Sequence, residues 1–179
     1  MFTRLMRRDP LEANIEKLYG AIVAQARTPA FYTAYGVPDT ATGRFDMIVL
    51  HVHLVVRRLV GEGAERRTAG QRLTEIFFSD MDANLRELGV GDLSVPRQMR
   101  GIAEAYYGRA KSYDAALQET GEAVLAAALA RNVFGKPEPV SAAAERLARY
   151  VRRFQATLVA QADASIARGE IAFPRPEEA

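Results

Sequence analysis

Two histidines in one apolar segment are the first residues of this sequence whose types could support chemistry. His51 and His53 lie two positions apart in a stretch with the pattern of an α-helix. Because each residue advances an α-helix by about 100°, their side chains point roughly 160° apart. Two histidines that bind one metal ion from a single helix stand four positions apart, so this pair does not form such a site. We expect one histidine near the packed face of the helix and the other at its edge.

A role in ligand binding stays open for the same two residues. Imidazole titrates near neutral pH and is a common ligand of metals and haem iron. A helical protein that binds a small ligand or haem is therefore our alternative hypothesis. Our main hypothesis, developed below, requires no cofactor and no metal ion.

Asp80 and Asn84 interrupt the apolar side of the helix predicted over residues 67–88. They stand one turn apart, close enough to share one partner. The apolar residues of the same arc are Leu73, Ile76, Phe77, Phe78, Met81, Leu85 and Leu88. A buried carboxylate without a partner costs on the order of several kcal/mol. Two interpretations remain open: Asp80 bridges to an Arg, Tyr or His on a neighbouring helix, or it forms a polar spot in a peptide-binding groove.

The carboxylates do not complete a catalytic site. Asp80 and Asp82 are two positions apart on one helix, so their side chains diverge. The segments "GEG" and "GVG" lack the lysine and the spacing of a phosphate-binding loop. The chain has no cysteine, which excludes disulfides, thiolate nucleophiles and cysteine-bound metals. We rank an enzyme that relies on Asp80 last and expect a protein without catalytic activity.

The composition is that of an ordinary globular domain. The chain has 179 residues, of which 49% are hydrophobic and 26% charged, and this argues against disorder throughout. The net charge of +2 is too small to indicate a nucleic-acid partner. The first ten residues lack the apolar stretch of a secretory signal. No segment reaches the roughly 20 apolar residues that a transmembrane helix needs.

Proline, glycine and capping residues divide the chain into helices. The helices are predicted over about residues 10–27, 30–35, 42–60, 67–88, 95–110, 113–133 and 141–168. The predicted fold is an all-α, single-domain bundle of about six or seven helices. It covers residues 10–169, with a flexible arm at 1–9 and a frayed tail at 170–179.

The segment over residues 42–60 is apolar on two sides. Met47, Leu50 and Leu54 form a second stripe opposite a broad wedge of Phe, Ile, Val and Leu residues. Such a helix is typical of the centre of a bundle. The many β-branched residues leave a strand as the competing interpretation, but the length of the segment favours a helix.

Two basic regions suggest contact with lipid headgroups or an acidic partner. Arg146, Arg149 and Arg153 share one side of the last predicted helix, away from its apolar stripe. Arg4, Arg7 and Arg8 lie among apolar residues near the N-terminus. A merely solvated charged face remains the alternative for the last helix.

Two stretches of the chain resemble the ubiquinol–cytochrome c chaperone family. They are "GRFDMIVLHVHLVVRRL", from Gly43 to Leu59, and "LTEIFFSDMDANLRELGVGDLSVPRQMRGIAEAYYGRAKSYDAAL", from Leu73 to Leu117. The most specific part is "DMDANLRELGVGDLSVPRQM" followed by "YYGR". The resemblance covers roughly residues 31–133, and the first and last helices carry less of it. The residues that match by position are Asp46, Asp80, Asp82, Asn84, Asp92, Pro96, Arg97 and Arg100.

The resemblance implies a non-enzymatic assembly factor for the respiratory cytochrome bc1 complex. The partner it implies is newly made cytochrome b, and mitochondrial members act together with a small companion protein. No catalytic residue is carried over. The Ala- and Arg-rich composition suggests a bacterial member, so we expect a cytoplasmic protein that contacts the inner membrane peripherally.

A chaperone of an apolar client needs an apolar patch rimmed by charge. Methionines and aromatic residues suit adaptable contacts of this kind. The residues predicted to contact the client are Met47, Leu50, Leu54, Phe77, Phe78, Asp80, Met81, Asn84, Arg97 and Arg100.

Overall fold

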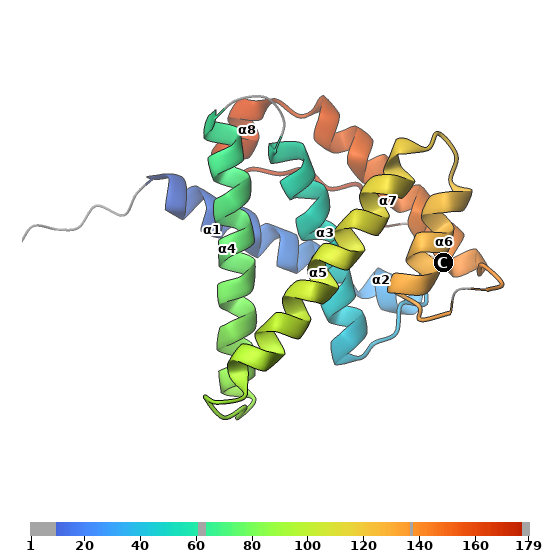
Figure 1. The fold of residues 1–179 in the computed structure, drawn as a ribbon. Helices are drawn as coiled ribbons and strands as arrows, with labels where there is room; N and C mark the ends of the chain where they lie inside the picture. Colours follow the sequence, from blue (N-terminus) through green and yellow to red (C-terminus); the bar gives the residue numbers. More distant parts are fainter. Residues whose placement is uncertain (1–9, 61–63, 137, 177–179) are drawn as a thin grey trace, which may run out of the picture.

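The computed structural model describes residues 10–60, 64–136 and 138–176. Every regular element in these ranges is helical, and none of the described residues forms a strand (Figure 1). The helices are α1 (Pro10–Ala26), α2 (Pro29–Thr33), α3 (Ala41–Leu59), α4 (Ala64–Glu87), α5 (Val95–Gln118), α6 (Ala123–Asn132), α7 (Ala142–Ala160) and α8 (Asp163–Ala167). The predicted all-α fold is confirmed. The arm predicted over residues 1–9 lies outside the described residues.

Helix α3 lies at the centre of the bundle and packs against α1, α4, α5 and α7. Every residue from Asp46 to Val55 is buried, so both predicted apolar stripes face other helices. The helix begins at a side-chain cap, because Thr40 Oγ1 accepts a hydrogen bond from the Gly43 amide at 3.1 Å. Only glycine fits at position 43, since a Cβ there would lie 2.0 Å from the carbonyl oxygen of Pro38.

The central position of α3 corrects part of the predicted client-binding patch. Met47 and Leu50 are 0% exposed and Leu54 is 3% exposed. Phe77 on α4, also predicted to contact the client, is 0% exposed as well. The prediction of an accessible patch is wrong for these four residues. Their apolar surface is already covered by neighbouring helices and belongs to the core.

The helix boundaries differ from the prediction in the second half of the chain. Helix α5 continues through residues 110–113, where a break was predicted, and ends at Gln118. The predicted last helix is divided, because α7 ends at Ala160 and α8 begins at Asp163. Both ends are held by side chains from distant parts of the sequence, which local patterns do not reveal.

The C-terminal segment packs against the body instead of fraying. Ile171 and Phe173 lie against the hydrophobic core. The Phe173 ring is 5.1 Å from the Phe154 ring and 6.4 Å from the His51 ring, measured between centroids. The prediction of a frayed tail is therefore wrong for residues 170–176, whereas residues 177–179 lie outside the described chain.

Arginine side chains hold several helix ends in place. The last carbonyl groups of a helix lack hydrogen-bond partners within the helix. A cation near them also interacts favourably with the negative end of the helix dipole. The Arg152 guanidinium on α7 donates to the carbonyl oxygens of Ala116, Leu117, Glu119 and Gly121, at 2.6–3.2 Å. These four oxygens end α5 and begin the connection to α6. A residue of α7 therefore determines where α5 stops.

Arg58 and Arg146 repeat this arrangement elsewhere. Arg58 on α3 donates to the carbonyl oxygens of Leu158 and Gln161 at the end of α7, at 2.8 and 3.2 Å. Arg146 on α7 donates to the carbonyl oxygen of Ala34, directly after α2, at 2.6 Å. In each case one helix fixes the end of another that is distant in sequence.

We expect Arg152→Ala to lower the free energy of unfolding by about 2–4 kcal/mol, because it leaves several carbonyl groups without their charged donor. Arg149→Ala is the matched control, since Arg149 is an exposed arginine one turn earlier on α7. Its effect should stay within about 0.5 kcal/mol. Urea denaturation followed by circular dichroism measures both. Equal stabilities of the two variants would contradict a capping role for Arg152.

Candidate functional site

His51 is enclosed in the core and both of its ring nitrogens have partners. Nδ1 lies 2.8 Å from the carbonyl oxygen of Met47, which can only accept, so Nδ1 carries the proton. Nε2 lies 2.9 Å from the Tyr150 hydroxyl and therefore accepts from it. Gln25 in turn donates to the same hydroxyl at 3.0 Å. Burial lowers the pKa of His51 to about 4, and the neutral ring has no nitrogen left for haem or a metal.

His53 lies on the other side of α3, beside a cleft. The prediction of an edge position is only partly met, because His53 is 5% exposed. Its Nε2 is 3.1 Å from Asp114 Oδ1, and the same oxygen is 3.1 Å from Arg57 Nε. Burial lowers the pKa of His53, and the Asp114 carboxylate opposes this shift. His53 is therefore held neutral or nearly so at pH 7 beside an ion pair.

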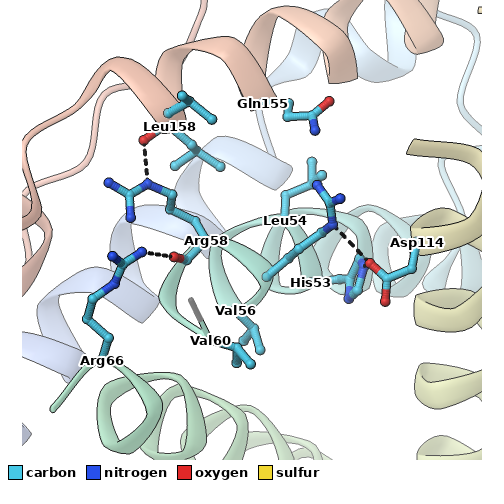
Figure 2. Close-up of a pocket in the computed structure, with 11 residues that line it drawn as sticks. His53, Leu54, Val56, Arg58, Val60, Arg66, Asp114, Gln155 and Leu158 are labelled. Atoms are coloured by element: carbon cyan, nitrogen blue, oxygen red, sulfur yellow. Dashed lines mark hydrogen bonds and ion pairs between the residues drawn. The ribbon is translucent and has the colours of Figure 1, made fainter. Parts of the chain in front are cut away.

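The cleft has a volume of about 560 Å³ and lies between α3, the start of α4, α5 and α7 (Figure 2). Aliphatic side chains and arginines make up most of its lining. In Figure 2, Arg58 reaches the carbonyl oxygen of Leu158, and Arg66 reaches that of Arg58 at 2.7 Å. Both arginines also contact Asp163. Arg58 and Arg66 therefore stabilise helix ends, and their guanidinium groups already have partners within the protein.

The lining of this cleft does not form a hydrolytic site. His53 and Asp114 resemble the base and the orienting carboxylate of a triad. However, the described residues that line the cleft include no serine, threonine, cysteine or lysine that could act as nucleophile. Elsewhere in the described chain, no group of three His, Cys, Asp or Glu side chains is placed to hold a metal ion.

The α4–α5 helix pair presents an accessible apolar surface, which we call the hairpin face. Its members are Phe78, Met81 and Leu85 at helical spacing along α4, Leu88 directly after the end of α4, and Tyr107 on α5. The Phe78 and Tyr107 ring centroids are 6.1 Å apart, which brings the two helices together on this side. Phe78, Met81 and Leu85 are partly buried, whereas Leu88 is 81% and Tyr107 is 59% exposed. Two residues of the predicted patch, Phe78 and Met81, therefore belong to this face.

Asp80 is the structural bridge that one of the two interpretations predicted. The buried Tyr19 hydroxyl on α1 donates to Asp80 Oδ2 at 2.7 Å. Asn84 does not share this partner, because its amide nitrogen donates to the main-chain oxygen of Asp80 at 2.6 Å. Asp80 thus ties α4 to α1, while Asn84 remains exposed on the hairpin.

The remaining predicted arginines fall into two groups. Arg97 and Arg100 are exposed at the start of α5, and neither has an ion-pair partner in the described part of the chain. Arg146 is held by Ala34, and Arg153 approaches the Tyr35 hydroxyl at 3.5 Å.

The prediction of a free basic stripe on the last helix is therefore wrong for Arg146 and Arg153. These two side chains make contacts within the protein. Of Arg146, Arg149 and Arg153, only Arg149 is exposed. Arg4, Arg7 and Arg8 lie outside the described residues.

The sequence analysis missed two contributors to the accessible surface. Neither Tyr107 nor Leu93 was singled out, although they are 59% and 99% exposed. A leucine within the glycine-containing turn "GVGDLS" was the available signal, because such turns are usually polar. None of the described helices is both long and apolar enough to cross a membrane.

Comparisons with known proteins identify relatives of this chain. Residues 33–173 match the family described as ubiquinol-cytochrome C chaperone. Ubiquinol-cytochrome-c reductase complex assembly factor 1 of Xenopus laevis is 25% identical over 137 residues, which cover 76% of this chain and 68% of that protein. The assembly factor 1 of Drosophila melanogaster is 28% identical over 148 residues, which cover 80% of this chain and 57% of that protein. The chain therefore spans little more than half of the length of the Drosophila protein.

A solved structure extends the similarity to three dimensions. The crystal structure of the Cbp3 homolog from Brucella abortus is similar with a TM-score of 0.84 and 38% sequence identity. The match covers 93% of this chain and 91% of that chain. The arrangement of helices in this protein is therefore shared over nearly its whole length.

We expect Asp80→Ala to lower the free energy of unfolding by about 1–3 kcal/mol, because it leaves the buried Tyr19 hydroxyl without its acceptor. Asp82→Ala is the control and should cost at most about 1 kcal/mol, since Asp82 pairs with Arg86 at the surface. Melting temperatures of the two variants, measured by circular dichroism, test the difference. Indistinguishable values would show that the bond to Tyr19 does not stabilise the fold.

The burial of His51 predicts acid sensitivity. The unfolded chain binds a proton at this residue near pH 6.5, whereas the folded protein does so only near pH 4. The stability from the neutral ring is thus complete above pH 6.5 and is lost as the pH falls toward 4, by up to about 3 kcal/mol. Urea denaturation across this range should show a shallower loss for His51→Gln than for the wild type. Parallel curves would contradict this assignment.

Proposed function

Since the chain belongs to the ubiquinol-cytochrome c chaperone family, we propose that it is a non-enzymatic assembly factor of the cytochrome bc1 complex and that its client is newly made cytochrome b. The family confirms the resemblance seen in the sequence and extends it through α7 and α8 to residue 173. Two curated relatives carry the name of assembly factors of ubiquinol-cytochrome c reductase, which supports the role in assembly.

The observation that carries the client-binding part of this proposal is the exposed hairpin face. Its residues lie on two helices that pack together, and a chaperone needs such apolar surface without loss of its own fold. Met81 and the aromatic rings can adapt to different side chains of a client. The hairpin also carries Arg97 and Arg100, whose unengaged charges keep the surface hydrated and can contact acidic or carbonyl groups of the client.

The same reasoning assigns no catalytic step to the protein. The His53–Asp114 pair lacks a nucleophile, and the arginines of the cleft are engaged by main-chain oxygens and Asp163. The haem-binding alternative loses the support of His51, because both ring nitrogens of this residue are used within the core. A binding surface is what the described residues offer.

The location and the further partner follow as proposals from the client. Cytochrome b is a membrane protein, so a chaperone that receives it works at the membrane surface. We place the protein on the cytoplasmic side of a bacterial inner membrane, and the Brucella abortus relative supports the bacterial assignment. A small companion assembly protein is a second expected partner.

Deletion of the gene should lower the amount of assembled cytochrome bc1 complex while unrelated respiratory complexes stay unchanged. Restoring the wild-type chain should recover the complex.

For a Met81→Asp/Tyr107→Asp double variant, we expect the amount of cytochrome b recovered by affinity purification to fall by at least about fivefold. The reason is that the variant loses roughly 1 kcal/mol or more of apolar contact with the client. Native gels and quantitative mass spectrometry measure the two effects.

The matched control is Val124→Asp/Val159→Asp, which alters exposed aliphatic residues on α6 and α7. It should behave as the wild type, and circular dichroism should show that all variants are folded. Normal bc1 levels in the deletion strain would refute the role in assembly. Equal cytochrome b recovery with both double variants would instead refute the placement of the client on the hairpin face.

A further inference from the structure

The turn that joins α4 and α5 exposes two leucines almost completely. We call residues 88–94 the hairpin tip, in which Leu88 is 81% and Leu93 is 99% exposed. No residue from Phe78 to Ser94 is buried, so this end of the hairpin has no core of its own. Single exposed leucines are common on proteins, but a pair on one short turn forms a local apolar point.

The tip is an ordered turn with defined hydrogen bonds. The Val90 amide donates to the Leu85 carbonyl and the Gly89 amide donates to the Arg86 carbonyl, both at 3.0 Å. Together with the φ of +80° at Gly89, these two bonds form a Schellman ending of α4. The Ser94 amide then donates to the Gly91 carbonyl at 2.7 Å, just before α5 begins. The leucines are therefore presented by a structured turn, which lowers the entropic cost of a contact.

The charges around the tip leave two guanidinium groups unengaged. Arg86 lies 2.7 Å from Asp82 and 2.5 Å from Asp92, so these two acids are already paired. Arg97 and Arg100 follow Leu93 within the first two turns of α5 and have no ion-pair partner in the described chain. Guanidinium groups bind phosphate through paired hydrogen bonds.

We propose that the hairpin tip enters the headgroup layer of a phospholipid membrane, with Leu88 and Leu93 in the acyl boundary and Arg97 and Arg100 on lipid phosphates. The tip projects at the end of the bundle opposite α8 (Figure 1), so a flat surface can reach it without meeting the rest of the protein. A protruding apolar point fits a bilayer, which deforms around it, whereas a protein partner would need a matching pocket.

This inference deepens the proposed function, because it places the hairpin face beside the membrane in which the proposed client resides. It also replaces the basic stripe of α7 as the membrane contact, since Arg146 and Arg153 are engaged internally. The hairpin face and the hairpin tip share Leu88, so a client could be received next to the lipid surface.

Vesicle co-sedimentation of the full chain tests the proposal. Vesicles of phosphatidylglycerol and phosphatidylethanolamine should bind the wild type, and Leu88→Ser/Leu93→Ser should weaken binding by at least about tenfold. Arg97→Gln/Arg100→Gln should weaken it as well and reduce its dependence on salt. Val159→Ser, at a 70% exposed residue of α7, is the matched control and should bind as the wild type.

The absence of tryptophan from the chain provides a direct second readout. Tryptophan placed by Leu93→Trp should show a blue-shifted fluorescence on addition of the vesicles, whereas tryptophan placed by Val159→Trp should not. The proposal is overturned if the wild type does not bind vesicles, or if Leu88→Ser/Leu93→Ser binds them as tightly as the wild type. If Leu88→Ser/Leu93→Ser binds vesicles as the wild type does but no longer recovers cytochrome b, the proposal is also overturned and the tip is assigned to the client.

Failure of this proposal is distinguishable from failure of the assembly function. Vesicle binding is measured with the purified chain and needs no client. The assembly function is measured by the bc1 content of the deletion strain. Normal bc1 content together with tip-dependent vesicle binding would retain the membrane contact and remove the proposed client.

Discussion

The complete burial of α3 is the constraint on which the rest of the structure depends. A helix with ten consecutive buried residues needs neighbours on every side, and it carries Asp46, His51 and His53 into the interior with it. Each of these polar side chains has a partner on another helix. Asp46 pairs with Arg109 at 2.7 Å, His51 with Tyr150, and His53 with Asp114. Burial raises the pKa of Asp46 to about 6 although Arg109 opposes the shift. The residues that most suggest chemistry in the sequence therefore serve to hold α3 in the bundle.

Arginine is the second means of assembly. Arg58, Arg146 and Arg152 each cap the end of another helix, and these contacts join residues from 31 to 112 positions apart. Arg146, Arg152 and Arg153 on α7 are engaged by internal contacts, so the partner surface that we propose lies on α4 and α5 instead. From Phe78 to Ser94 this pair has no buried residue, and most of the hairpin face lies in this part of the molecule.

Periodicity and capping predicted most of the helices and the central place of α3. They did not predict which apolar side chains are accessible, because a stripe such as Met47, Leu50 and Leu54 looks the same whether another helix covers it or not. The end of α5 at Gln118 depends on Arg152, 34 residues later, and no local pattern carries that information. The Asp80 bridge was among the stated alternatives, but its partner Tyr19 lies 61 positions away. The family motifs identified the relatives without separating residues that fold from residues that bind.

The central claim is that the hairpin face receives the client while the core stays closed. Photocrosslinking in cells tests it most directly, with a photoreactive residue placed singly at positions 81, 107, 124 and 149. Cytochrome b should be attached from positions 81 and 107 on the hairpin face, and it should be absent from positions 124 and 149 on α6 and α7. Attachment of cytochrome b from positions 124 and 149 with none from 81 and 107 would contradict the account.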